Sequence, residues 1–552
     1  MAEFSDAPVL IVGGGPVGMA LAIDLALRDI ASIVIEQRKR GQFIPAKANM
    51  TNIRSMEHFR RWGMADMLRR NDVVSPEVQR DVSIVTRLTG HLVHHFPKTY
   101  EAKDALQFAA ELGEWAPNLT IEKTLFERAE QLPLIDRRYG HEVSTFTQDD
   151  DGVTVHATGP SGPVELRGQY LVVAAGAANR LRREVLGVRM TGKPNLGKAF
   201  SWHVRAPQIK HIWKAGPVVS MVYFYNEDRA ADLLIPQNET ADEFLYYSCP
   251  MPEGFDGNNW EEVKAMLLRA VGQNIDVEPI SGGGFNLHSL TAPRFDYGRV
   301  FLAGDAAHLV SPQGGFGMNL GIGDAADLGW KLAAVLQGWG GPMLLPTYTT
   351  ERREAVLLCQ RGSEENQAKQ AHSLVRDGIE KDGPEGDAIR QLVSQDIVTY
   401  KTQQFKSMGG QLGYSYTASP IIVRDGTPLP EPKFAVYEPS AKPGNRVPHH
   451  WLADGSSLFD HFSQGFTLIN LGHLDGDALL RAAHIKRIPV TVFTPEEPDR
   501  SELREKYEAD GVLVRPDQHV AWRGNQLPSD LDELLGIVTG FPIQNAQPSS
   551  HQ

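Results

Sequence analysis

The chain has 552 residues, of which 41% are hydrophobic and 22% charged, so its length favours two or three globular domains. Acidic residues outnumber basic residues by 68 to 55, and the resulting formal net charge of -13 argues against nucleic acid or an anionic membrane as the partner. Two cysteines are too few for a disulfide framework or a thiolate metal cluster, so we expect no metal site. The N-terminus has no basic signal region, and no segment approaches the roughly 20 apolar residues of a membrane span, which indicates a cytoplasmic protein.

The N-terminal stretch predicts a dinucleotide-binding site. A β-branched strand, a glycine turn, a helix and a second strand are expected at 9–12, 13–18, 19–27 and 31–35. In this order, glycines let a pyrophosphate lie against the N-terminus of the helix, where free N–H groups and the helix dipole favour negative charge. Glu36 follows the second strand, about 20 residues after the turn, where a carboxylate can accept hydrogen bonds from ribose hydroxyls. The pattern is compatible with NAD or FAD, and the expected contacts are Gly13, Gly15, Pro16, Val17, Gly18, Glu36 and Gln37.

A second glycine-rich turn follows a strand much later in the chain. The run 299–303 predicts a buried strand, Gly304 and Asp305 end it, and an apolar helix is expected at 318–336. The spacing of a second dinucleotide fingerprint is absent, so this helix N-terminus is interpreted as the binding site for the other half of one long cofactor. Asp305 would bind a ribityl chain, and the bare loop would let a flat flavin ring lie against the main chain, which favours FAD. The turn adds the expected cofactor contacts Asp305, Pro312, Gly315, Gly317, Met318 and Asn319.

Both motifs resemble those of the single-component (class A) FAD-dependent aromatic hydroxylases. The similarity rests on Gly13–Gly18 and on "GDAAHLVSPQGGFGMNLGIGDAADLGWKLAAVL", which begins at Gly304. It extends to "AKANMTNIRSMEHFRRWGMAD" from Ala46 and to "TYTTERR" at 347–353. The tail "LVRPDQHVAWRG" at 513–524 is similar to the thioredoxin-like domain of the phenol hydroxylase branch. The further FAD contacts that the resemblance implies are Lys47, Ala48 and Asn118.

The resemblance also implies an α/β fold with three parts: a Rossmann-type FAD-binding domain, an inserted β-sheet substrate domain and a C-terminal thioredoxin-like domain. The predicted FAD-binding domain is discontinuous and comprises 1–75, 105–185 and 286–360. The other predicted boundaries are 76–104 and 186–285 for the substrate-binding domain, 361–429 for a helical linker and 430–552 for the C-terminal domain. No C-x-x-C pair occurs in this last region of the sequence, which excludes thiol redox chemistry there.

The function that the resemblance implies is that of an FAD-dependent monooxygenase. It would hydroxylate a phenolic or related aromatic compound with O2 through a C4a-hydroperoxide of the flavin, with NAD(P)H as the transient co-substrate. The acid–base part of the protein would be to ionise the phenol, for which the candidates are Tyr223, Tyr225 and His288. The expected partners are therefore a small aromatic substrate and O2, and the sequence is compatible with a homodimer.

One departure from the family pattern leaves two alternatives open. Family members carry an acid before the glycine in the segment "LVVAAGAANRLRR", where this chain has Ala175. In the family that acid helps to hold the cofactor, so its loss favours a flavoenzyme with atypical reduction, either an oxidase or a monooxygenase that uses an external reductant. The second alternative is a degenerate flavin-binding protein that serves a partner through its C-terminal tail. Intact Gly13, Gly18, Glu36 and Asp305 argue against it.

Overall fold

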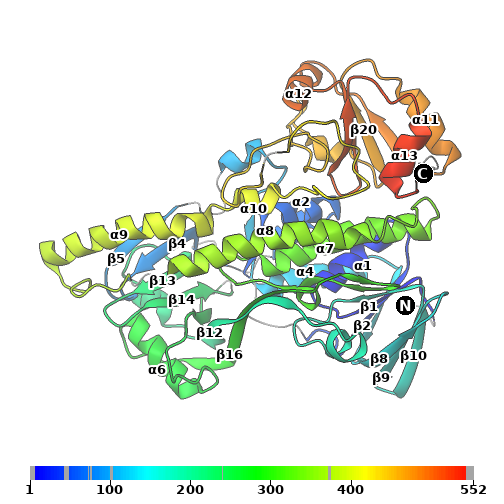
Figure 1. Ribbon diagram of the computed structural model, residues 1–552. Coiled ribbons are helices and arrows are strands. Elements are labelled where there is room, and N and C mark those ends of the chain that lie inside the picture. The colour runs from blue at the N-terminus through cyan, green and yellow to red at the C-terminus, as the bar shows by residue number, and fades with distance from the viewer. Residues whose placement is uncertain are drawn as a thin grey trace, which may run out of the picture.

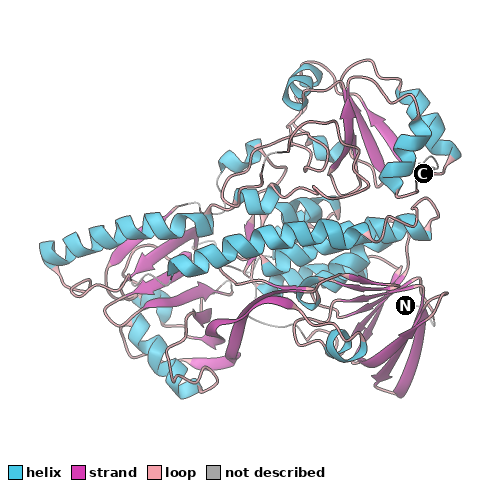
Figure 2. Cartoon of the chain, in the orientation of Figure 1, coloured by secondary structure: helices cyan, strands magenta, loops and turns pink. Residues whose placement is uncertain are grey.

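Two sheets and a small C-terminal domain meet around a set of long helices (Figure 1). The computed structural model describes residues 6–42, 49–71, 74, 78–97, 99, 103–238, 240–370, 374–429 and 431–542. In Figure 2 the long helices form a middle layer, with the two sheets below it and the C-terminal domain above it. Within the described ranges, no helix is both long enough and apolar enough to cross a membrane.

The first sheet has six strands in the order β17-β18-β11-β1-β2-β7. These strands are Asp296–Tyr297, Val300–Leu302, Tyr170–Val173, Val9–Val12, Ser32–Glu36 and Ile135–Tyr139. β1 pairs in parallel with β2 and β11, and β11 pairs in parallel with β18. Parallel sheets are covered on both faces, which explains the continuous β-branched runs of these strands. Only β11 separates the strands that precede the two glycine turns, so both turns leave the same edge of the sheet.

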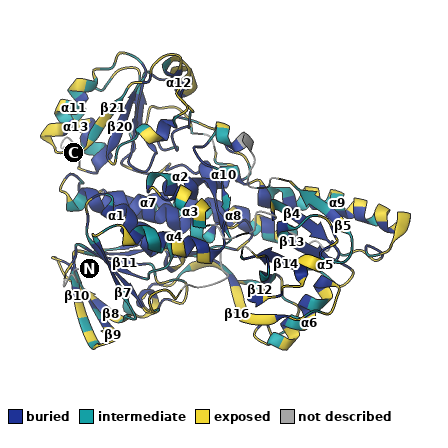
Figure 3. Cartoon of the chain, turned by 180° about the vertical axis from the view of Figure 1, so that it is seen from behind, coloured by how far each residue is buried: buried dark blue, intermediate teal, exposed yellow. Residues whose placement is uncertain are grey.

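Helices cover one face of this sheet and a small second sheet covers the other (Figure 1). The helices are α1 (Pro16–Ala26), α4 (Asn118–Glu130) and α7 (Gly317–Leu336). The small sheet consists of β8 (Glu142–Gln148), β9 (Val153–Gly159) and β10 (Gly162–Gly168). The shorter elements of this region are α2 (Ile53–Arg61), α3 (Ala65–Asn71), β3 (Met50–Thr51), β6 (Glu114–Trp115), the 3₁₀ turns Lys103–Gln107 and Gly304–Ala306, and the π-helical turn Leu181–Val185. In Figure 3, α1 and α7 are mostly buried, and the few charged residues on them are paired inside the protein.

The largest sheet has eight strands in the order β19-β16-β12-β15-β14-β13-β4-β5. They are His308–Leu309, Glu278–Thr291, Thr191–Arg205, Glu243–Ser248, Ala230–Pro236, Val219–Tyr225, Gln79–Val85 and Leu92–Phe96. Successive side chains of a strand point to opposite faces, so β13 contributes to two cores. Val222 and Phe224 pack with α6 (Trp260–Val271), whereas Tyr223 and Tyr225 pack with α9 (Gly383–Phe405).

Long helices connect the sheets to the C-terminal region. They are α8 (Thr347–Gln370), α9 and the short α10 (Met408–Leu412), while α5 (Ile209–Ile212) is a single turn in the large sheet's connections. The predicted boundary at 360 lies inside α8, so the end of the predicted FAD-binding domain and the start of the predicted linker share one continuous helix. The other domain boundaries stay predictions.

The C-terminal region has the thioredoxin-like arrangement that the resemblance implied. Its elements in chain order are the 3₁₀ turn Leu458–His461, β20 (Phe466–Asn470), α11 (Gly476–Ile485), β21 (Val490–Phe493), α12 (Asp499–Tyr507), β22 (Gly511–Val514), β23 (Val520–Gly524) and α13 (Leu531–Thr539). The sheet order is β21-β20-β22-β23, with β20 and β21 parallel and the other pairs antiparallel. The predicted α/β class is confirmed.

A buried network of charges joins this C-terminal domain to α7 and α8. Arg515, which follows β22, donates to both carboxylate oxygens of Glu351 at 2.6 and 2.7 Å and to Asp327 at 3.3 Å. Lys331 binds the same two acids at 2.6 and 2.7 Å. Asp517 accepts from Arg515 at 2.7 Å, and every side chain of the network is at most 3% exposed. The domain is therefore docked by charges that have no access to water.

We predict that Arg515→Met lowers the free energy of unfolding by ~3–5 kcal/mol, because it leaves buried carboxylates without their cation. Urea unfolding of the purified protein measures the change. Arg481→Met is the matched control, since the Arg481 side chain is 70% exposed on α11 of the same domain. Equal unfolding curves for the two variants would contradict the docking role of Arg515.

Candidate functional site

The first glycine turn joins β1 to α1 through contacts that exclude side chains. Gly13 has a φ of +112°, and a Cβ atom there would lie 2.5 Å from the carbonyl oxygen of Ala174. A Cβ atom on Gly18 would lie 2.0 Å from the carbonyl oxygen of Gly13. At Gly15, an added Cβ atom meets nothing within 4 Å, and no side chain caps the N-terminus of α1. No described residue therefore fills the space in front of Gly15, so the uncapped N-terminus of α1 can accept a pyrophosphate there.

Glu36, at the end of β2, lies beside this turn. Its carboxylate accepts hydrogen bonds from Gly14 N–H at 2.7 Å and from Arg38 N–H at 2.8 Å. The Arg38 guanidinium donates to Glu122 of α4 at 2.9 Å, and Glu122 accepts from the Asn118 amide at 3.1 Å. The structure thus brings the predicted residues Glu36 and Asn118 into one cluster. Arg38 and Glu122 were not predicted, and the run "EQRKR" at the end of β2 was the signal for Arg38.

The second glycine turn lies directly against the first. Val17, in the first turn of α1, packs against Gly304 and Gly321, where added Cβ atoms would lie 2.9 and 2.4 Å from its Cγ2 atom. Asp305 follows Gly304 in a 3₁₀ turn and is exposed. An exposed carboxylate is therefore held at a fixed distance from the uncapped N-terminus of α1.

A buried acid on α7 holds the second turn in place. Asp324 accepts a hydrogen bond from Gly304 N–H at 3.0 Å and pairs with His308 Nε2 at 2.8 Å and Arg352 Nε at 2.9 Å. These three side chains are almost wholly inaccessible to water. Burial opposes ionisation of Asp324, but the opposite charges and hydrogen bonds of His308 and Arg352 outweigh it and lower its pKa from 3.8 to about 2. His308 and Arg352 therefore position the turn.

The loop before α7 is tied to the segment that precedes α2. The Asn319 amide donates to the carbonyl oxygens of Gly315 at 2.7 Å and Met50 at 3.2 Å. Its oxygen accepts from Asn52 N–H at 2.9 Å. A Cβ atom on Gly315 would lie 2.8 Å from the Met50 side chain, and the φ of Gly315 is +69°. Asn319 therefore shapes the loop through its side chain.

The remaining predicted cofactor residues surround these two turns. Gly317 begins α7, whose N-terminus has no side-chain cap, and an added Cβ atom there meets nothing within 4 Å. Pro312 and Gln37 are exposed and Met318 is half-buried. The predicted contacts that lie outside the described residues are Lys47 and Ala48.

The arrangement as a whole fits a long dinucleotide that carries a flavin. Two helix N-termini have no side-chain cap and no described atom within 4 Å of a Cβ added at Gly15 or Gly317, so they suit a pyrophosphate and an electron-rich ring edge. The exposed Asp305 suits a polyol chain that must cross between them. FAD has these three parts, whereas NAD has no group for the second helix.

The predicted catalytic residues are divided between two places. Tyr223 and Tyr225 lie together on the α9 side of β13, with ring centroids 6.5 Å apart, and Tyr223 Oη accepts from Gln404 Nε2 at 2.9 Å. His288 lies on β16, which β12, β15 and β14 separate from β13, and its Nδ1 accepts from Asn195 N–H at 3.2 Å. The structure therefore does not bring His288 to the two tyrosines. Three strands intervene because the sheet order differs from the chain order.

The electrostatics of the two tyrosines restrict what they can do. Burial raises the pKa of Tyr223 and of Tyr225 above the ordinary value of 10.0. Both phenols therefore keep their protons at neutral pH and can donate a hydrogen bond, but neither is a base there. Because of these raised pKa values, we do not expect Tyr223 or Tyr225 to remove the proton of the substrate.

One charged residue beside the tyrosines was missed. Lys401 of α9 is 4% exposed, and its Nζ lies 4.7 Å from the ring centroid of Tyr223. It interrupts an apolar stripe formed by Val393, Ile397 and Phe405, at the i, i+4 spacing of one helix face. A lysine within such a stripe was the signal in the sequence.

Ala175 lies against the first glycine turn. It follows β11, it is exposed, and its Cα would be 3.1 Å from a Cβ atom on Gly13. A longer side chain at this position would start beside the pyrophosphate turn. The unusual residue is therefore at the cofactor end of the site, as its place after the strand indicated.

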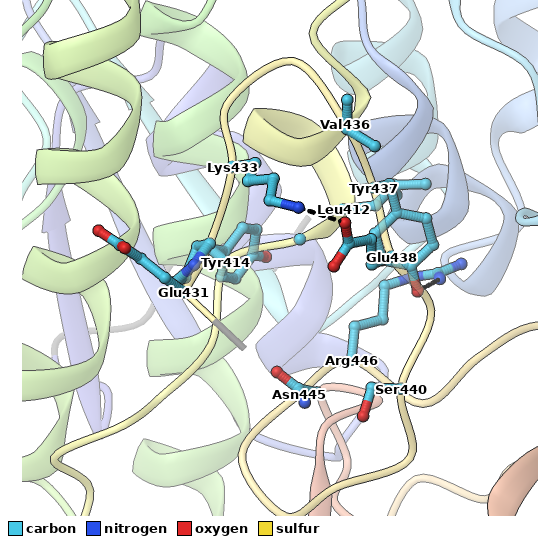
Figure 4. A pocket seen from close by; sticks show the side chains of 12 residues that line it. Leu412, Tyr414, Glu431, Lys433, Val436, Tyr437, Glu438, Ser440, Asn445 and Arg446 are labelled. Carbon is cyan, nitrogen blue, oxygen red and sulfur yellow. Dashed lines mark hydrogen bonds and ion pairs between the residues drawn. The ribbon is translucent and has the colours of Figure 1, made fainter. Parts of the chain in front are cut away.

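A separate small pocket lies between the end of α10 and the loop 431–446 (Figure 4). Its volume is about 20 Å³, which accommodates a water molecule and not an aromatic ring. Lys433 pairs with Glu438 at 2.6 Å across its mouth, and Arg446 donates to Tyr437 at 3.1 Å. This pocket is a polar gap in the interdomain packing.

Comparison with known proteins agrees with this geometry. The family described as FAD binding domain matches residues 6–361, and the family described as aromatic-ring hydroxylase, C-terminal, matches residues 440–542. The FAD-dependent monooxygenase apdD of Emericella nidulans is 30% identical over 97% of this chain and 91% of the relative. Phenol 2-monooxygenase of a Pseudomonas species is 27% identical over 97% of this chain and 93% of the relative. The solved structure of the rebeccamycin biosynthetic enzyme RebC with reduced flavin has a TM-score of 0.86 at 33% identity, and covers 97% of this chain and 99% of that chain.

The fold and the paired glycine turns thus define a flavoprotein with a Rossmann-type FAD-binding domain, an inserted sheet and a thioredoxin-like C-terminal domain. The chain belongs to the family of FAD-dependent aromatic-ring hydroxylases, as the resemblance predicted. It is an FAD-dependent monooxygenase, and the comparisons support neither the atypical flavoenzyme nor the degenerate flavin-binding protein.

We predict that Asp324→Asn lowers the free energy of unfolding by ~3–5 kcal/mol at neutral pH, because it leaves Arg352 buried without a counter-charge. The pKa of Asp324 is lower in the folded state, so the wild-type advantage is fully present above pH 3.8 and disappears as the pH falls through about 2. Urea unfolding of both proteins at several pH values between neutral and acidic measures this difference in the free energy of unfolding. A difference between variant and wild type that is the same at every pH would contradict the assignment.

Proposed function

We propose that this monooxygenase hydroxylates a phenolic or related aromatic compound with O2, using electrons from NAD(P)H. The observation that carries the proposal is the contact of the two glycine turns through Val17, which holds the exposed Asp305 beside the N-terminus of α1. The name of the related phenol 2-monooxygenase supports a phenolic substrate. NAD(P)H as the electron donor is typical of the family.

In this proposal, the two glycine turns bind different parts of FAD. Gly13, Gly15 and Gly18 would hold the pyrophosphate of FAD, with Glu36 beside the adjoining ribose and Asp305 on the ribityl chain. The loop around Gly315 and Gly317, with the N-terminus of α7, would lie against the isoalloxazine ring. When bound and reduced, FAD supplies the activation of dioxygen and the transfer of one oxygen atom to the ring of the substrate.

The contribution of the protein itself would be binding, orientation and exclusion of water. The substrate would lie between the flavin loop and the α9 side of β13, where Tyr223 and Tyr225 are buried. A protonated Tyr223 can donate a hydrogen bond to an oxygen of the substrate, because its own oxygen already accepts from Gln404. An apolar wall of this kind keeps water from reactive groups.

The proposal includes a cytoplasmic location, which the two free and buried cysteines support. Assembly into homodimers stays a prediction from the sequence. Gel filtration with light scattering measures the assembly directly.

We predict that the protein purifies yellow and that Asp305→Ala weakens FAD binding by about 10- to 100-fold, since a polyol hydroxyl loses a charged partner. Equilibrium dialysis of the apoprotein with FAD measures the dissociation constant. Asp377→Ala, at an exposed acid before α9, is the control and should bind FAD as the wild type does. Unchanged FAD affinity for Asp305→Ala would remove Asp305 from the cofactor site.

We predict that Ala175→Asp speeds reduction of the bound flavin by NADPH, by up to about 100-fold. An acid at this turn accepts hydrogen bonds from cofactor hydroxyls. It thereby restricts the positions that the cofactor can take when hydride is transferred to it. Stopped-flow bleaching of the flavin measures the rate, and Ala178→Asp controls for added charge on the same exposed turn. If the flavin is reduced equally fast in the wild type and in Ala175→Asp, the residue at position 175 has no effect on flavin reduction.

A further inference from the structure

Lys401 is a buried lysine that has no carboxylate partner among the described residues. Two lysines are buried among the described residues, Lys331 and Lys401. Lys331 binds the carboxylates of Asp327 and Glu351, whereas the Nζ of Lys401 has a 3.3 Å hydrogen bond with the neutral amide oxygen of Gln404. No carboxylate within the described ranges lies at ion-pair distance from Lys401.

An isolated buried ammonium is costly, so a protein retains one where something compensates it. Burial lowers the pKa of Lys401 from 10.5 to about 7, so the amine changes charge near neutral pH. Its other close neighbours are the ring faces of Tyr223, at 4.7 Å, and Tyr225, at 6.0 Å. Ring faces attract a cation but do not neutralise it. The described neighbours of Lys401 therefore supply no negative charge to pair with its protonated form.

Polar groups from the flavin side reach the same region. The Cys249 thiol lies within electrostatic range of Lys401 and interacts with Tyr247 and with Gln313 of the loop that precedes α7. The Tyr247 hydroxyl is buried and makes no regular hydrogen bond to a described residue. The Asn366 amide contacts the Gln313 carbonyl at 3.5 Å, while its own buried oxygen makes no hydrogen bond to a described residue. Cys249, Tyr247 and Gln313 thus link the surroundings of Lys401 to the loop that precedes α7.

The apolar neighbours indicate what kind of molecule belongs there. The rings of Phe96 and Phe405 lie 5.2 Å apart, and Phe405 lies 6.3 Å from Tyr223, so further aromatic rings adjoin the two tyrosines beside Lys401. Such rings pack well against another flat ring. A ligand that satisfies both features is an aromatic ring with an ionised oxygen.

We propose that Lys401 binds the ionised oxygen of an aromatic substrate, either a carboxylate or a phenolate, and so selects acidic aromatics for hydroxylation. This inference rests on the proposed function and names the substrate class of the same site. A phenol transfers its O–H proton to the neutral amine, which gives an ammonium–phenolate pair. A carboxylate enters ionised, and the amine takes a proton from water, which releases hydroxide to the bulk solvent. No electrons move in either case, and Tyr223 remains a hydrogen-bond donor beside the pair.

Ligand binding to the FAD-loaded protein tests the proposal without turnover. The probes are 2-naphthoate, 2-naphthol and the neutral naphthalene-2-carboxamide, and the readout is the change in the flavin absorption spectrum. We expect Lys401→Met to weaken at least one of the two acidic probes by about 10- to 100-fold and the carboxamide by less than about threefold. Lys401→Arg should retain most of the affinity, and Lys406→Met, at an exposed lysine that follows α9, should behave as the wild type.

The pattern of losses identifies the ligand group. If Lys401→Met loses affinity for 2-naphthoate alone, the bound group is a carboxylate. If it loses affinity for 2-naphthol alone, the bound group is a phenolate. Either outcome supports the proposal. Equal losses for all three probes, or no loss, overturn it. So does a wild-type protein that binds neither acidic probe more tightly than the carboxamide. Failure of the proposed function would appear separately, as a protein without FAD or without aromatic-stimulated NAD(P)H oxidation.

Thermal unfolding of the ligand-free, FAD-loaded protein gives a second reading. If Lys401 serves a ligand, Lys401→Met keeps or raises the Tm, because an unpaired buried amine is replaced by an apolar chain of similar length. A fall of more than about 5 °C would assign Lys401 a structural role and overturn the proposal.

Discussion

The buried carboxylate of Asp324 is the interaction on which the cofactor site depends. It lies on α7, the helix whose N-terminus faces the site, and it holds the Gly304 N–H group of the turn that carries Asp305. His308 and Arg352 balance its charge, so one buried cluster joins the turn, α7 and α8. Val17 then packs against Gly304, which joins this cluster to the pyrophosphate turn. A long cofactor needs its two halves at a fixed separation, and this chain of contacts sets it.

The C-terminal domain strengthens the same two helices from the outside. Arg515 reaches Glu351 and Asp327, one on α8 and one on α7, and Lys331 sits between these acids. Buried charges of this kind contribute little net stability, but they fix orientation, because a shifted domain would leave them unpaired. The thioredoxin-like domain is therefore held against α7 and α8 by paired charges that fix its orientation.

On the substrate side, the same helix layer supplies a charge that is left uncompensated. Lys331 and Lys401 are both buried, yet the first lies between carboxylates and the second beside two tyrosine rings. The first arrangement stabilises the fold without a ligand. The second becomes favourable when an anion enters, which makes Lys401 suited to recognition. The presence or absence of a carboxylate partner thus distinguishes Lys331, which stabilises the fold, from Lys401, which we propose binds a ligand.

The sequence by itself determined the features that depend on neighbouring residues. Strand, glycine turn and helix follow one another within a few residues at Gly13–Gly18 and again around Asp305, and their physical requirements are local, so FAD binding was predictable from the residues. The family was predicted from the resemblance of these motifs to known proteins. Tertiary structure alone decided which distant groups meet: Arg352 with Asp324, Arg515 with Glu351, and Lys401 with Tyr223. It also separated His288 from the tyrosines, because three strands of the sheet intervene. Such pairings depend on the order of strands in the sheet and on how helices pack. The hydrophobic periodicity and the composition of a sequence do not specify which single side chains then meet.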